Sequence, residues 1–121
     1  MSIWLVLSVL FLHWVADFVL QTHKWSVGKS KNWEDLLSHT FTYTLMWLIP
    51  VAVYGVYTDS PGTIMWFLPI TFATHTAIDF YTSRVNAQLY KDDKHHDFFV
   101  SIGFDQFLHY AQLFLTIKLL L

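Results

Sequence analysis

Four long apolar stretches fill most of this sequence, and they restrict the kind of fold that the chain can adopt. They cover residues 3–22, 35–57, 62–83 and 98–121. Each is close to the roughly 20 residues that an α-helix needs to cross the hydrocarbon core of a bilayer. Hydrophobic residues make up 55% of the 121 residues and charged residues only 13%, so the chain is more apolar than an average soluble domain. We therefore predict one all-α domain over residues 1–121, an up-down bundle of four transmembrane helices.

Punctuating residues refine this prediction. Pro50, Gly55 and Pro69 fall inside the second and third stretches. Neighbouring helices in a bundle can satisfy the backbone groups that such residues free, so we expect kinks there. Ser60 before Pro61 suggests a helix N-cap and first turn.

The basic residues are distributed unevenly along the chain. Six of the seven lie in the first and third connections: Lys24, Lys29, Lys31, Arg84, Lys91 and Lys94. Connections rich in Lys and Arg face the cytoplasm, so the termini and the turn at Asp59 are expected outside. No basic residue precedes the first apolar run and no small-residue cleavage site follows it, so we expect that run to be a retained span.

Composition also excludes several classes of function. A net charge of −2 provides no broad basic field, which argues against a nucleic-acid partner. With no cysteine, the chain has no thiolate ligand or nucleophile, so imidazole and carboxylate are the available metal ligands.

Each apolar stretch carries one histidine and one aspartate four residues apart, which places both on one helix face. The eight side chains, which we predict to be metal ligands, are His13, Asp17, Asp35, His39, His75, Asp79, Asp105 and His109. The order is His before Asp in stretches one and three and the reverse in two and four, so an up-down bundle gathers all four pairs at one end. The His-x3-Asp-Phe pattern occurs at both 13–18 and 75–80, a weak repeat that indicates two duplicated helix pairs.

The balance of charge favours a bound cation. Four aspartates enter the predicted bundle, whereas Lys118, near the far end, is the one Lys or Arg inside a span. Buried carboxylates need a counter-charge, supplied either by divalent metal or by protonated histidines paired with them. We predict one or two divalent ions, with Zn as the first choice and Mn, Fe, Co or Ni as alternatives.

Taken together, these motifs resemble a known family. The segments His13-x3-Asp17-Phe18-x2-Gln21, His75-x3-Asp79-Phe80 and Asp105-Gln106-x2-His109, with His39, are similar to a bacterial and phage family of small multi-pass membrane proteins, the domain of unknown function number 3307. The resemblance covers nearly the whole chain and implies a bacterial inner-membrane location, but it carries no known activity.

Our leading functional hypothesis is a metal-dependent hydrolase at the cytoplasmic membrane face, acting on a lipid-like or membrane-associated substrate. A bound metal lowers the pKa of its water, and an aspartate off the metal can act as general base. Asp17 and Asp105 are the candidates, because each has a glutamine nearby in the sequence. Membrane lipids are the expected surroundings, and the residues leave the oligomeric state open.

Three other functions remain open. The same ring of residues could bind or relay a metal ion or proton without hydrolysis. Histidines on facing helices could hold a b-type haem, although flanking aspartates suit an apolar macrocycle poorly. A structural or regulatory membrane protein would tolerate the loss of these carboxylates.

Overall fold

The computed structural model describes residues 1–59 and 61–121, with the backbone alone at Pro61. Ser60, and with it the N-cap expected there, lies outside the described residues. Within them the chain is helical almost throughout and has no strand, which confirms the all-α prediction. The elements are α1 (Ile3–Trp14), the π-helical turn η1 (Val15–Val19), α2 (His23–Gly28), α3 (Trp33–Met46), α4 (Leu48–Thr58), α5 (Pro61–Ile64), α6 (Phe67–Lys91) and α7 (His95–Leu120).

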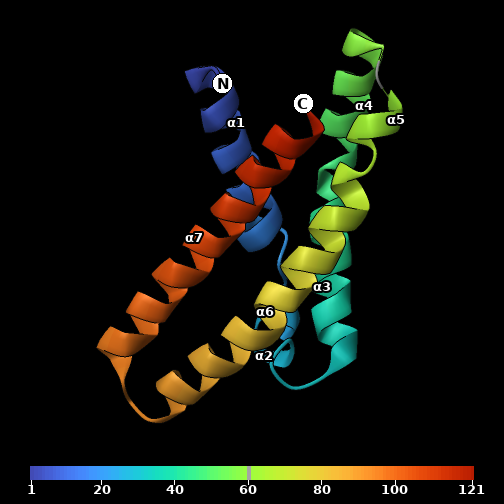
Figure 1. Ribbon diagram of the computed structural model, residues 1–121. Coiled ribbons are helices and arrows are strands. Elements are labelled where there is room, and N and C mark those ends of the chain that lie inside the picture. Colours follow the sequence, from blue (N-terminus) through green and yellow to red (C-terminus); the bar gives the residue numbers. More distant parts are fainter. Residues whose placement is uncertain (60) are drawn as a thin grey trace.

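The helices run back and forth between two ends of the molecule. Both termini lie at one end together with the junction of α4 and α5, whereas α2 and the turn between α6 and α7 lie at the other (Figure 1). α6 packs along α7, and α3 packs against both α6 and η1. This arrangement is the one expected for an up-down bundle, with the first and third connections at the same end.

The last two helices are longer than the apolar stretches that predicted them. α6 continues to Lys91 and α7 already begins at His95, so the two form a hairpin around residues 92–94. The chain therefore extends well past Asp79 on α6 and past Asp105 on α7 before it turns. Because both helices extend beyond their aspartates by a similar length, Asp105 lies at the level of Asp79 although it is several residues inside its apolar stretch.

Proline accounts for one helix interruption in this chain. α3 ends at Met46 and α4 starts at Leu48, four and two residues before Pro50. A proline ring clashes with the carbonyl four residues earlier, which here belongs to Met46. Pro69 is the third residue of α6, where its missing N–H costs nothing, and α4 continues through Gly55. Of the three positions where kinks were expected, the helix is interrupted next to Pro50, whereas the helices run on through Gly55 and Pro69.

This bundle buries an unusual number of ionisable side chains and exposes many large apolar ones. The buried polar side chains include four histidines and four aspartates, His13, Asp17, Asp35, His39, His75, Asp79, Asp105 and His109. Large apolar side chains such as Trp4, Ile49 and Phe107 are more than 60% exposed on the outside. A smaller apolar core, including Val9, Trp47 and Phe67, also lies inside the bundle.

Among the described residues, Trp33–Thr58 is the one helical stretch that length and composition allow to cross a membrane unaided. Ile3–Val19 is apolar but shorter. A bundle with four membrane spans therefore remains a prediction.

Candidate metal centre

A π-helical turn presents the carboxylate at the centre of the site. In η1 the amide of Leu20 donates to the carbonyl of Val15, five residues back, at 2.9 Å. This widened turn contains Asp17, whose side chain is 5% exposed. Single π-helical turns are rare and occur often at functional sites. The sequence pattern predicted a plain α-helix here.

Four side chains from three helical segments meet in the middle of the bundle. They are Asp17 from η1, His39 from α3, and His75 and Asp79 from α6, all buried. Asp17 Oδ1 lies 3.0 Å from His39 Nε2 and 3.5 Å from His75 Nε2. Asp79 Oδ2 lies 3.1 Å from His39 Nε2 and 3.4 Å from His75 Nε2. The two Nε2 atoms are 3.3 Å apart. We call these four residues the central group.

These separations match the spacing of donor atoms around a small metal ion. Metal–ligand bonds of about 2.0 to 2.1 Å at tetrahedral angles place neighbouring donors about 3.3 Å apart. The five separations in the central group lie between 3.0 and 3.5 Å. Two imidazoles and two carboxylates are also a common donor set for Zn and other first-row divalent ions. The central group therefore has both the geometry and the chemistry to hold one ion.

A second set of potential ligands shares Asp17 with the central group. Asp17, Asp105 and His109 offer ligand atoms within 4.8 Å of one another. His109 Nδ1 donates to the backbone carbonyl of Asp105 at 2.7 Å, which directs Nε2 into the site. That Nε2 lies 3.2 Å from Asp79 Oδ1 but is not aligned to form a hydrogen bond with it.

His13 is held by hydrogen bonds through both of its ring nitrogens. Nδ1 lies 2.8 Å from the Tyr43 hydroxyl, and Nε2 lies 2.8 Å from Gln106 Oε1. Because the amide oxygen accepts, Nε2 carries the proton and Nδ1 accepts from Tyr43. The Gln106 amide nitrogen donates to Asp105 at 3.1 Å and to Asp17 at 3.4 Å. The structure therefore places His13 in a layer behind the carboxylates, where it orients Gln106.

A lysine that the sequence pattern did not place inside the bundle enters the site. Lys29, from the connection between α2 and α3, donates to Asp79 Oδ2 at 3.1 Å, and its side chain is only 18% exposed. Burial alone would lower the pKa of Lys29, but the charges of Asp79 and Asp17 outweigh burial and raise it. The sequence-based expectation of carboxylates without a lysine or arginine counter-charge was therefore wrong, because a connection folds back into the bundle.

Asp35 lies apart from the other predicted ligands. Its carboxylate accepts from the Asn32 side chain at 2.9 Å, and its backbone amide donates to the Asn32 side chain at 2.8 Å. Exposed Lys24 lies 3.8 Å away. The structure thus uses Asp35 to fix the start of α3, and brings together the other seven predicted residues. Asp35 lies on the same face of α3 as His39, but one helical turn away from it and outside both ligand groups.

The Asp35 carboxylate packs against Gly28, and this contact gives a prediction. A Cβ atom at residue 28 would overlap that carboxylate, whereas one at Gly103 would meet nothing within 4 Å. Overpacking typically costs about 1 to 3 kcal/mol, so we expect Gly28→Ala to lower the melting temperature in detergent clearly. Gly103→Ala, in the exposed middle of α7, should leave it unchanged or raise it. Equal melting temperatures for the two variants would contradict this account of the loop.

Comparison with known proteins adds the family. No curated protein and no solved structure matches the chain. The model of a family described as "Protein of unknown function (DUF3307)" matches residues 5–121, a range that includes every residue of both ligand groups as well as His13, Lys29 and Gln106. The chain therefore belongs to this family.

Proposed function

We propose that the central group binds one divalent metal ion, with Zn as the first choice. The observation that carries this proposal is the set of five donor separations between 3.0 and 3.5 Å. A second ion could use Asp17, Asp105 and His109.

The alternative, in which protonated histidines neutralise the aspartates, explains the geometry less well. His39 Nε2 and His75 Nε2 face each other at 3.3 Å. If both carried protons, two N–H groups and two positive charges would be in contact in a buried site. At most one of them can be protonated there, whereas a metal ion uses both lone pairs.

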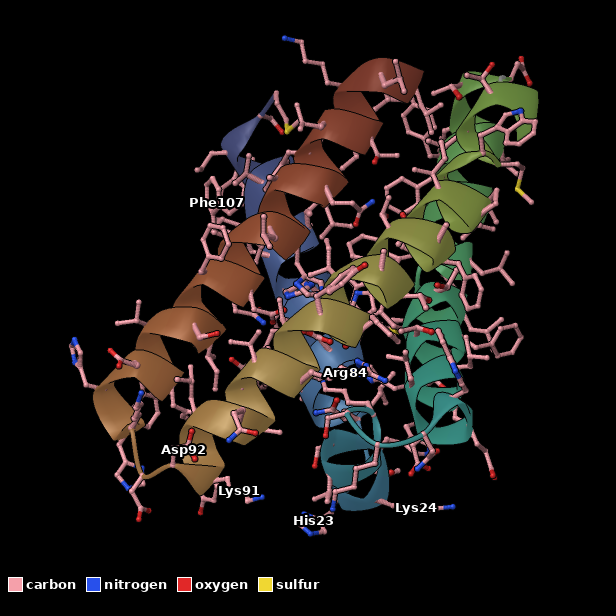
Figure 2. All side chains as sticks on the ribbon, turned by 60° about the horizontal axis from the view of Figure 1, so that its bottom comes forward. His23, Lys24, Arg84, Lys91, Asp92 and Phe107 are labelled. Atoms are coloured by element: carbon pink, nitrogen blue, oxygen red, sulfur yellow. The ribbon has the colours of Figure 1, made fainter. Side chains whose placement is uncertain are left out.

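We further propose that the bundle spans the bacterial inner membrane, with the centre toward the cytoplasm. Support comes from the large apolar side chains on the outside and the ionisable ones inside. Intramembrane ionisable groups face the bundle interior and are usually functional. Lys24 and Lys91 lie at the same end of the molecule, as Figure 2 shows. By the positive-inside rule this end faces the cytoplasm.

This orientation can be tested with single cysteines, because the chain has none of its own. In oriented membrane vesicles, Lys94→Cys should react with an impermeant thiol reagent from the cytoplasmic side and Asp59→Cys from the opposite side. Labelling of both positions from the same side would contradict the proposed topology.

For activity, we propose metal-dependent hydrolysis. A bound metal would supply a polarised water near neutral pH. Asp105 is the better general base, because its Oδ1 is buried without a hydrogen-bond partner among the described residues. Asp17 belongs to both ligand groups and is therefore the better ligand. Gln106, in contact with both carboxylates, would orient them. Metal binding without hydrolysis of any ester would instead favour a cation-handling role.

Elemental analysis of detergent-purified protein tests the metal centre. We expect about one zinc per chain in the wild type and almost none in His75→Ala, because that variant loses a ligand of the central group. His13→Ala should keep the metal at saturating zinc but bind it about 10 to 100 times more weakly, as expected for a residue behind the ligands. His23→Ala, which alters an exposed histidine, is the matched control. A wild type without metal after zinc loading would overturn the proposal.

A further inference from the structure

A cavity of about 750 Å³ opens beside the metal centre. It lies among η1, α2, α6 and α7, at the end of the bundle where His23 and Lys91 are seen in Figure 2. Asp17, Asp105 and Gln106 form part of its wall. A molecule in this cavity would therefore contact the carboxylates of the centre directly.

The inner wall of the cavity carries polar atoms that have no partner in the protein. Ser83 Oγ and Asp105 Oδ1 belong to residues that are less than 10% exposed, and neither atom has a hydrogen-bond partner among the described residues. The buried amide oxygens Gln21 Oε1 and Asn86 Oδ1, in partly exposed residues, also have no hydrogen-bond partner there. Buried polar atoms without partners cost free energy, so they gather where a ligand satisfies them. These four side chains indicate a polar ligand group.

Lysines in the cavity wall indicate that the ligand group is negatively charged. Lys29, Lys31 and Lys91 line the cavity. Lys31 and Lys91 are exposed and form no ion pair within the described part of the chain, and Lys29 already reaches Asp79. Ammonium groups around a pocket favour a phosphate group, to which the Ser83 hydroxyl can donate. The amides of Gln21 and Asn86 can donate to it through nitrogen after a half-turn about the terminal bond. Lys29 would then lie between this phosphate and the central group.

Apolar side chains complete the wall. Phe18, Phe98 and Ile102 line the cavity, and Phe18 is 46% exposed. A free phosphate ion would make no favourable contact with these apolar side chains. An alkyl chain, in contrast, would pack on them and continue along the apolar outside of the bundle.

We propose that this cavity binds a phosphate-bearing amphiphile, with the phosphate among the lysines and the chain on the apolar wall. The inference deepens the proposed function and rests on it for the reaction, which would be hydrolysis of a lipid phosphate monoester. The oxygen of water bonds to phosphorus while the bond from phosphorus to the lipid oxygen breaks. Asp105 accepts one proton from the water and passes it to the lipid oxygen, so the products are a lipid alcohol and inorganic phosphate.

Calorimetry on the full chain in neutral detergent tests this, with decyl phosphate, decanol and inorganic phosphate as probes. We expect decyl phosphate to bind at least about tenfold more tightly than either of the others, since both parts of the cavity contribute only to it. The double variant Lys31→Gln/Lys91→Gln should weaken decyl phosphate by about tenfold or more. Lys118→Gln, at the opposite end, should leave its affinity unchanged.

Equal binding of decanol would reduce the cavity to an apolar groove and overturn the proposal. If inorganic phosphate bound equally well, the alkyl chain would contribute nothing and the ligand would not be an amphiphile. If the double variant bound decyl phosphate as the wild type does, the ligand would bind elsewhere. The zinc content of each sample separates the two proposals. Protein that holds zinc but ignores decyl phosphate overturns this inference alone, whereas protein that binds decyl phosphate but takes up no zinc overturns the metal centre alone.

Discussion

Asp79→Asn should abolish zinc binding and destabilise the protein strongly. Asp79 contacts Lys29, His39, His75 and His109 within 3.1 to 3.4 Å, more charged or ionisable groups than any other residue of the site. An amide keeps the size of the carboxylate but removes its charge. Lys29 would then be a buried ammonium without its nearest counter-charge, which costs about 3 to 5 kcal/mol. We expect a large fall in melting temperature in detergent, and no zinc after loading.

Asp35→Asn is the matched control for this experiment. It makes the same chemical change at another buried aspartate, but one that lies outside both ligand groups. We expect this variant to keep its zinc. A zinc content for Asp79→Asn equal to that of Asp35→Asn would remove Asp79 from the metal centre.

Lys29→Met should have opposite effects on the metal-free and metal-bound protein. In the absence of metal, Lys29 is the one lysine or arginine within 4.0 Å of Asp79 among the described residues. Its removal leaves the carboxylates of the centre undercompensated, so we expect a loss of about 3 to 5 kcal/mol. With metal present, the ammonium competes for Asp79 Oδ2, so the variant should bind zinc more tightly than the wild type.

Thermal unfolding with zinc and with a chelator measures both effects. Zinc at 100 times its Kd stabilises a protein by about 2.7 kcal/mol, so it should restore much of the stability of Lys29→Met. Lys24→Met is the control, because Lys24 has a side chain that is 72% exposed and approaches Asp35 only to 3.8 Å. Such surface pairs contribute about 0 to 1 kcal/mol. If zinc stabilised Lys29→Met no more than Lys24→Met, Lys29 would not share a site with the metal.

Much of the candidate site follows from the spacing of residues along the chain. A histidine and an aspartate four apart share a helix face, and the reversed order in alternate helices gathers them at one end. Seven of the eight predicted residues meet in this way, His13, Asp17, His39, His75, Asp79, Asp105 and His109. Asp35 fits the same pattern but faces Asn32 and Gly28, because α3 begins only two residues before it.

The sequence by itself determined that the chain is all-helical and which helix faces carry the ionisable groups, because both follow from local periodicity. Tertiary structure alone decided which of these groups contact one another, since that depends on how separate segments fold back. It brought Lys29 to Asp79 across 50 residues, widened the turn around Asp17, and joined His13 to Gln106 by a hydrogen bond. No local periodicity encodes these features, because they depend on how segments far apart in the sequence pack together.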